Sequence, residues 1–183
     1  MVPLFKSHYS IGKSILTLNE SSQEAGSVSI FDLASTYDLS SIALVEDTLT
    51  GFLQAFHTST SLGIKLHFGL RISLCSDCTS PPPKGGDKTC HKIIIFSKNS
   101  VGCQLLNQIS YAFTQGSGRI DSTYLRNIWD SSCLKLAVPF YDSFIFNNLM
   151  TFSTCLMDFD FASPTFLLED NNLPFDSMVR EKV

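Results

Sequence analysis

Residues 41–72 have the sequence SIALVEDTLTGFLQAFHTSTSLGIKLHFGLRI, which predicts one complete strand, helix and strand unit. Residues 42–45 form a short apolar run typical of a buried parallel strand, and the run stops at two acids, Glu46 and Asp47. The next apolar residues recur at helical spacing until Gly63, where a left-handed helix cap is favoured. Residues 66–72 then return as a second strand. The unit therefore predicts a parallel, helix-covered sheet with acids at a strand end, a place where sites form.

The same alternation of strands and helices continues on both sides of this unit. We expect further strands at residues 2–5, 92–97 and 134–138, and weaker ones near 159 and 167. Helices are expected over residues 27–39, with Ser27 as the N-cap, and over 99–113, 123–128 and 144–152. The predicted fold class is α/β.

Composition limits the classes of protein to which the chain can belong. With 183 residues, 44% hydrophobic and 16% charged, the chain can form one domain or part of a larger one. Its net charge of −4 disfavours direct binding to DNA. No apolar run approaches the roughly 20 residues of a membrane helix, and the start lacks the pattern of a signal peptide. We therefore expect a cytoplasmic protein with reduced cysteines and no membrane contact.

The central unit resembles the PHP (polymerase and histidinol phosphatase) domain, which opens bacterial C-family replicative DNA polymerases, the polymerase III alpha subunits. The resemblance rests on ALVEDT at residues 43–48, on GIKLHFGLR at 63–71 and on SHYS at 7–10. Its most specific part is HKIIIFSKNSVGCQLLNQISYAFTQG at residues 91–116. The resemblance implies a PHP-type distorted TIM-like (β/α)7 barrel, incomplete at its C-terminal side. Residues 1–183 would form a single such domain or the N-terminal fragment of one.

The metal-binding positions of this family have changed in the present sequence. They fall on Leu4, Lys6, Glu46, Asp47 and Arg71. Leucine has no donor atom and an ammonium group repels a cation, so only the two acids could still hold a loosely hydrated Mg²⁺ or Mn²⁺. Because Lys6 and Arg71 would share their pocket, we expect an internal salt-bridge cluster and no bound cofactor.

The resemblance therefore implies a non-catalytic scaffold or docking domain in DNA replication. The chain alone would be inactive but would belong to a DNA-directed DNA polymerase, a nucleotidyltransferase. Its partner would be the polymerase palm and fingers portion or a proofreading exonuclease subunit, and DNA would be reached only through that assembly. The alternative is a metal-dependent phosphoesterase or 3′–5′ exonuclease whose site is rebuilt from His8, Glu46, Asp47 and His67. That alternative requires the four side chains to converge on one point.

A Cys/Pro/Gly-rich loop at residues 75–91 leaves two further interpretations open. Cys75, Cys78, Cys90 and His91 have the donor types of a tetrahedral zinc site. However, adjacent side chains of a strand face opposite ways, so Cys90 and His91 do not easily reach one metal. The triple proline and paired glycine are also typical of a surface loop with reduced cysteines.

Aromatic residues gather in the C-terminal third, next to the expected open edge of the sheet. We interpret this part of the chain as a docking surface, because open edges and exposed apolar rings favour association. The rings belong to Phe140, Tyr141, Phe144, Phe146, Phe152, Phe159, Phe161 and Phe166.

Overall fold

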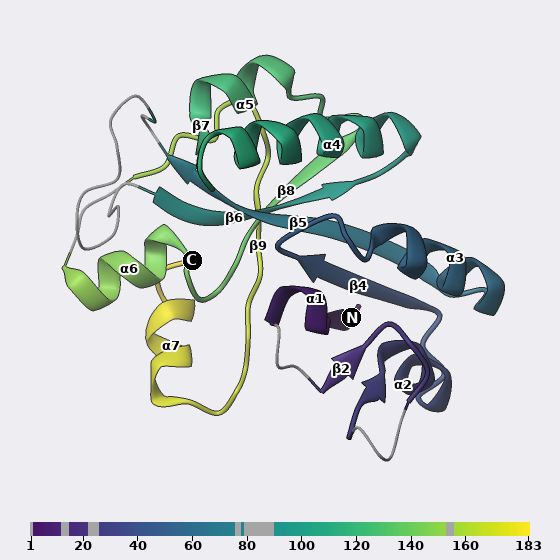
Figure 1. The fold of residues 1–183 in the computed structure, drawn as a ribbon. Helices are drawn as coiled ribbons and strands as arrows, with labels where there is room; N and C mark the ends of the chain where they lie inside the picture. The colour runs from purple at the N-terminus through teal and green to yellow at the C-terminus, as the bar shows by residue number, and fades with distance from the viewer. Residues whose placement is uncertain (1, 12–14, 22–25, 76–77, 79–89, 153–155) are drawn as a thin grey trace. The chain divides into compact units, whose positions relative to one another are not determined.

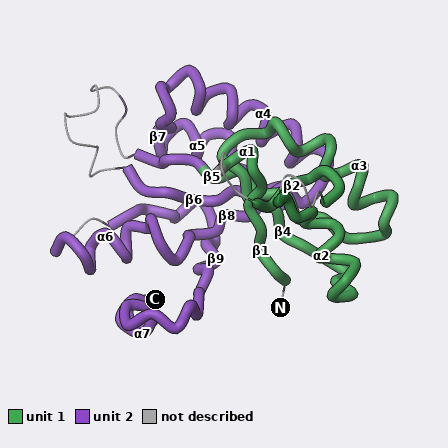
Figure 2. The backbone as a smooth tube through the Cα atoms, turned by 60° about the horizontal axis from the view of Figure 1, so that its bottom comes forward, with its two compact units in different colours: residues 1–71 green, residues 72–183 purple. Residues whose placement is uncertain are grey.

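The chain has a mixed α/β fold, whose helices and strands are shown in Figure 1. The computed structural model describes all residues except 1, 12–14, 22–25, 76–77, 79–89 and 153–155. It divides into two compact units, residues 1–71 and 72–183 (Figure 2). Within the described residues, no helix has the length and apolar character that a membrane span requires.

Unit 1 contains the predicted strand, helix and strand. Strand β4 (Ser41–Glu46) is followed by helix α3 (Phe52–Leu62) and strand β5 (Lys65–Cys75), whose last four residues belong to unit 2. The two strands are parallel, with Glu46 opposite Leu70. Gly63 has a φ of 68° and ends the helix in the left-handed conformation, as predicted.

The N-terminal part of unit 1 adds a short parallel strand and elements that the sequence did not predict. Strand β1 (Leu4–Phe5) pairs in parallel with β4 and is followed by helix α1 (His8–Ile11). Strands β2 (Leu16–Thr17) and β3 (Val28–Ser29) form a separate parallel pair. Because this pairing uses residues 28–29, helix α2 (Ile30–Thr36) begins later than expected, with Ser29 and not Ser27 as its N-cap.

Unit 2 starts with the end of β5 and continues with the predicted strand and helix of the most specific motif. These are β6 (Cys90–Ser97) and α4 (Ser100–Gln115). The Asn99 side chain caps α4 by accepting a hydrogen bond from the Gly102 N–H at 2.9 Å. A side chain at Gly102 would collide with the Cys133 carbonyl, so the Asn-x-x-Gly spacing meets two local requirements.

The remaining strands of unit 2 depart from an all-parallel sheet. Strand β7 (Ile120–Asp121) pairs in parallel with the end of β5 and leads into helix α5 (Ser122–Ile128). Strand β8 (Leu134–Val138), however, is antiparallel to β6, and β9 (Thr165–Phe166) is parallel to β8. The prediction of a parallel sheet therefore holds for the paired strands of unit 1 and is wrong for β6 and β8.

The C-terminal segment contains helices α6 (Phe144–Thr151) and α7 (Pro174–Arg180), of which only α6 was predicted. The weak strand expected near residue 159 is absent from the described residues there. The Asp158 carboxylate accepts the Asp160 N–H at 3.0 Å, and such a turn interrupts an extended chain. Of the aromatic rings in the expected docking surface, Phe140 is buried and Phe152 is 93% exposed.

Both units bury an apolar core between strands and helices. In unit 1 the fully buried large side chains are Ile30, Ile42, Leu44 and Leu70, with Phe68 nearly so. In unit 2 they include Ile72, Leu74, Ile95, Ile109, Leu125 and Leu136. Because the β4 side chains are buried from Ile42 to Val45, the strand fixes the position of Glu46, its last residue, and of Asp47, which follows it.

Candidate functional site

Glu46 and Asp47 lie at the carboxyl end of β4, and Arg71 lies beside them on the adjacent parallel strand β5, four residues before that strand ends. Glu46 ends β4 and is opposite Leu70 of β5, so Asp47 and Arg71 come at the same level of the sheet. Parallel strands place their carboxyl ends at one edge, where ligand sites form most often. The central unit thus brings Glu46, Asp47 and Arg71 together, as predicted.

Glu46 is fully buried, and its carboxylate is held by donors from the N-terminal segment. The Ser7 N–H donates to Glu46 Oε1 at 2.8 Å, and the Ser10 hydroxyl donates to Oε2. Ser10 Oγ in turn accepts the Asp47 N–H at 2.7 Å. These bonds replace the hydration that a buried carboxylate loses, so the Glu46 carboxylate is a structural group.

Asp47 forms an ion pair with Arg71, as the changed ligand set predicted. Arg71 Nε lies 2.6 Å from Asp47 Oδ1, and Arg71 Nη2 lies 2.9 Å from Oδ2. This is the bidentate geometry that a guanidinium and a carboxylate prefer. The two side chains are 20% and 32% exposed, so the pair lies at the boundary with solvent.

The other two positions of the family's ligand set lie on and just after β1. Leu4 is opposite Ala43 of β4 and is 42% exposed. Lys6 follows the strand and is half-buried. Neither side chain supplies a neutral or anionic donor atom, so β1 contributes no metal ligand.

The two histidines of the alternative site do not join Glu46. His67 is opposite Ala43, three residues before the partner of Glu46, which corresponds to about 10 Å along the strand. Burial and the nearby Lys65 lower the pKa of His67. The His8 ring packs on Tyr9 with centroids 4.2 Å apart, and its Nδ1 is buried without a hydrogen-bond partner. Over the described part of the chain, no three His, Cys, Asp or Glu side chains are placed to hold a metal.

The zinc interpretation of the Cys/Pro/Gly-rich loop is not realised either. Cys75 and Cys90 form a disulfide with Cα atoms 4.3 Å apart, which corrects the expectation of reduced cysteines for these two. Disulfide sulfurs are not the thiolates that zinc requires. His91 is buried, and its Nδ1 lies 3.4 Å from the Asn147 amide. Cys78 does not take part in this disulfide, whereas residues 76–77 and 79–89 of the loop lie outside the described residues.

By joining the end of β5 to the start of β6, the disulfide ties two strands of unit 2. Its two cysteines are 15 residues apart in sequence, and a loop of that length predicts a stabilisation of about 3 kcal/mol. The sequence motif that suggested a metal thus marks a covalent link.

Sequence reasoning missed the function of the Ser7 and Ser10 donors and a cleft elsewhere in unit 1. The motif Ser-His-Tyr-Ser was noticed, but its serines gave no sign of bonding to an acid 36 or 39 residues away. The cleft has a volume of about 630 Å³ and is lined by apolar side chains such as Leu18 and Phe31 and by polar ones such as Asn19, Glu20 and Gln54. None of the described residues that line it is basic, and none of them points to a ligand.

The comparisons with known proteins give no family for this chain: its sequence matches no protein-family model and no curated protein.

Proposed function

We propose that this chain is a non-catalytic, PHP-like domain of a replicative DNA polymerase system of the polymerase III alpha type. It would act as a scaffold or docking module, with a distorted, incomplete TIM-like barrel as its fold. Support comes from the sequence motifs at residues 43–48, 63–71 and 91–116, which keep the spacing of the family. The mixed α/β fold, with its parallel strands in unit 1, is compatible with this proposal.

The observation that carries the proposal is the state of the two acids at the end of β4. Glu46 is buried and accepts hydrogen bonds from Ser7 and Ser10, while Asp47 is paired with Arg71. A catalytic metal centre needs several ligands with lone pairs directed at one point and an open position for water. Here the chain's own donors and one cation occupy those lone pairs, which favours a structural function for the pocket.

The partners follow from the same proposal. A domain without its own chemistry contributes by positioning another subunit, here the polymerase palm and fingers portion or a proofreading exonuclease subunit. The chain's net charge of −4 opposes contact with the phosphate backbone, so DNA would be bound by the rest of the assembly.

Metal binding and hydrolysis by the purified chain test the proposal. We expect no saturable binding of Mn²⁺ or Zn²⁺ to this pocket in calorimetric titration. We also expect no hydrolysis of p-nitrophenyl phosphate or of a 3′-labelled DNA strand when Mn²⁺ is added. The informative variant is Asp47→Asn, which removes one carboxylate without changing shape. Mn²⁺-dependent hydrolysis that this variant abolishes would overturn the proposal and restore the phosphoesterase or exonuclease alternative.

A further inference from the structure

Helix α7 buries a carboxylate beside a valine and leaves two large apolar side chains exposed. Its inward side chains are Asp176 and Val179, which are 1% and 0% exposed, whereas Phe175 and Met178 are each 45% exposed. Residues three apart share one face of a helix, so the two exposed side chains form an apolar pair on the outer face. A surface helix normally turns its large apolar side chains toward the core and its charged side chains toward solvent.

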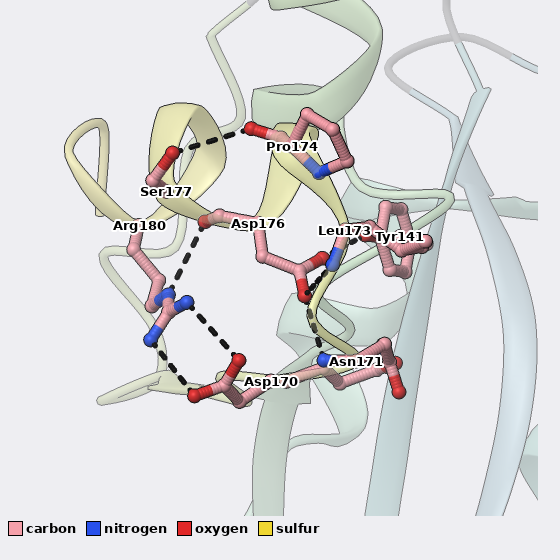
Figure 3. Close-up of polar contacts among 9 residues, drawn as sticks. Tyr141, Asp170, Asn171, Leu173, Pro174, Asp176, Ser177 and Arg180 are labelled. Atoms are coloured by element: carbon pink, nitrogen blue, oxygen red, sulfur yellow. Dashed lines mark hydrogen bonds and ion pairs between the residues drawn. The ribbon is translucent and has the colours of Figure 1, made fainter.

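The position of α7 is fixed by hydrogen bonds to the Asp176 carboxylate (Figure 3). The carboxylate accepts the Asn171 N–H at 2.6 Å, the Leu173 N–H at 3.2 Å and the Tyr141 hydroxyl. Arg180, in the last turn, donates to the Asp176 carbonyl at 3.3 Å. Because these contacts hold the inner face, the outward orientation of Phe175 and Met178 is set by the fold.

The neighbouring helix α6 is also apolar and is only partly buried. None of its eight residues is buried, although its sequence is FIFNNLMT. It contacts α7. Phe152, which ends the helix, has a φ of 53° and a ring that is 93% exposed. A phenylalanine seldom adopts this conformation, and strained residues of this kind gather at functional sites.

Charge is distributed unevenly along the chain and selects among possible occupants of these helices. Residues 139–183 contain seven acids and two bases, a net charge of −5, whereas the preceding residues sum to +1. Two of the acids, Asp158 and Asp160, pair with Arg126 of the preceding part, and Asp176 is buried, so the other acids supply most of the surface charge. A second copy of the chain would bring like charges together in a symmetric contact. DNA and an anionic membrane surface would be repelled for the same reason. A cationic partner with apolar anchors is favoured.

We propose that the exposed apolar side chains at the C-terminal end of α6 and on α7, namely Met150, Phe152, Phe175 and Met178, form a docking surface for a basic amphipathic helix of a partner protein. The apolar face of that helix would cover these side chains, and its Lys and Arg residues would lie against the acidic surroundings. This inference rests on the proposed scaffold function, which requires a docking surface, and it names the chemistry of the partner.

Fluorescence anisotropy with two labelled 18-residue peptides tests this surface on the full chain. One peptide has leucines at helical spacing with lysines elsewhere, and the other has the same leucines with glutamates elsewhere. We expect only the lysine peptide to bind, with a dissociation constant that rises as salt is increased. The double variant Phe152→Ser/Phe175→Ser should weaken binding at least tenfold.

The matched control is Leu53→Ser, which removes a leucine that is 63% exposed on α3 of unit 1. It should leave peptide binding unchanged, and thermal melts should show that all variants remain folded. Equal binding of both peptides, or an equal loss with Leu53→Ser, would overturn the inference. The inference would also be overturned if the chain alone self-associated in sedimentation equilibrium and the double variant abolished that association. If the lysine peptide does not bind and the chain shows no metal-dependent hydrolysis, only the docking surface is overturned. Metal-dependent hydrolysis would instead overturn the proposed scaffold function.

Discussion

Two buried carboxylates, Glu46 in unit 1 and Asp176 in unit 2, are satisfied in the same way but stand in different places. Glu46 is 0% and Asp176 is 1% exposed. Each accepts a hydrogen bond from a hydroxyl and from backbone N–H, that of Ser7 for Glu46 and those of Asn171 and Leu173 for Asp176. Glu46 ends a parallel strand, where catalytic acids are common, whereas Asp176 lies in the first turn of a helix. From this comparison we predict that the donors around an acid, more than its place in the fold, decide whether it can bind a ligand.

Removal of the Glu46 side chain should have the largest effect on stability. Glu46→Ala leaves the Ser7 N–H and the Ser10 hydroxyl without their acceptor in a buried place. We expect the free energy of unfolding to fall by about 3 kcal/mol, because unsatisfied buried donors and a lost bond to a charged group both cost energy. Urea denaturation followed by circular dichroism measures this loss.

Glu46→Gln is the matched control, since its amide keeps one carbonyl oxygen as an acceptor in nearly the same shape. It should lose clearly less stability than Glu46→Ala. An alanine variant as stable as the natural chain would contradict the structural function of Glu46 and return it to the list of possible ligands.

Asp176→Ala should have the next largest effect, because Asp176 orients α7 through Tyr141 and two backbone N–H groups. We expect the Tm to fall by roughly 5 °C in calorimetry. Asp170→Ala is the control: its carboxylate is 65% exposed and reaches Arg180 only at 3.4 Å, so the Tm should stay nearly constant. Equal effects of the two variants would show that the buried network does not hold the helix.

The change in the free energy of unfolding at acid pH gives a further test of Asp176. Hydrogen bonds from Tyr141, then from the Asn171 and Leu173 N–H groups, hold the pKa of Asp176 below its ordinary value of 3.8. A lowered pKa means that the carboxylate adds stability above the ordinary value, and this is lost as the pH falls through the folded pKa. The unfolding free energy of Asp176→Asn should therefore fall less between pH 5 and pH 2 than that of the natural chain. Asp130 and Asp158, whose pKa values are also lowered, remain in both proteins and cancel.

Local sequence signals predicted most of the regular elements and the meeting of the acids with Arg71. The core strands β4, β5, β6 and β8 and helices α3 and α4 follow from apolar periodicity, caps and glycine positions. Parallel pairing of β4 and β5 then brings Asp47 and Arg71 to one level. These features depend on residues that are near one another in sequence or on the register of a single pair of strands.

The missed features depend on contacts that sequence spacing does not reveal. Helix α1 has only four residues and is placed by bonds from Ser7 and Ser10 to Glu46. The disulfide required knowledge that β5 and β6 bring Cys75 and Cys90 together. Helix α7 did carry a signal: Pro174 at its first position and Asp176 in its first turn are typical of a helix start.

The Arg71–Asp47 pair should have the smallest effect on stability, and it tests which group keeps metal away. Both side chains are partly exposed, so Arg71→Gln should change the free energy of unfolding by no more than about 1 kcal/mol. Arg126→Gln is the control in unit 2, because Arg126 is also a partly exposed arginine, at 40%, and pairs with the acids Asp158 and Asp160.

Calorimetric titration of the Arg71→Gln variant with Mn²⁺ gives the second measurement. The variant frees the Asp47 carboxylate, but Glu46 remains buried and bonded to Ser7 and Ser10. One partly exposed carboxylate holds a divalent ion poorly, so we expect no saturable binding. If saturable binding appeared, the cation and not the donors around Glu46 would be the barrier to metal. The hydrogen-bond donors around Asp176 would then still explain why it is not a ligand, but those around Glu46 would not explain this for Glu46. The two carboxylates would resemble each other only in their contribution to stability.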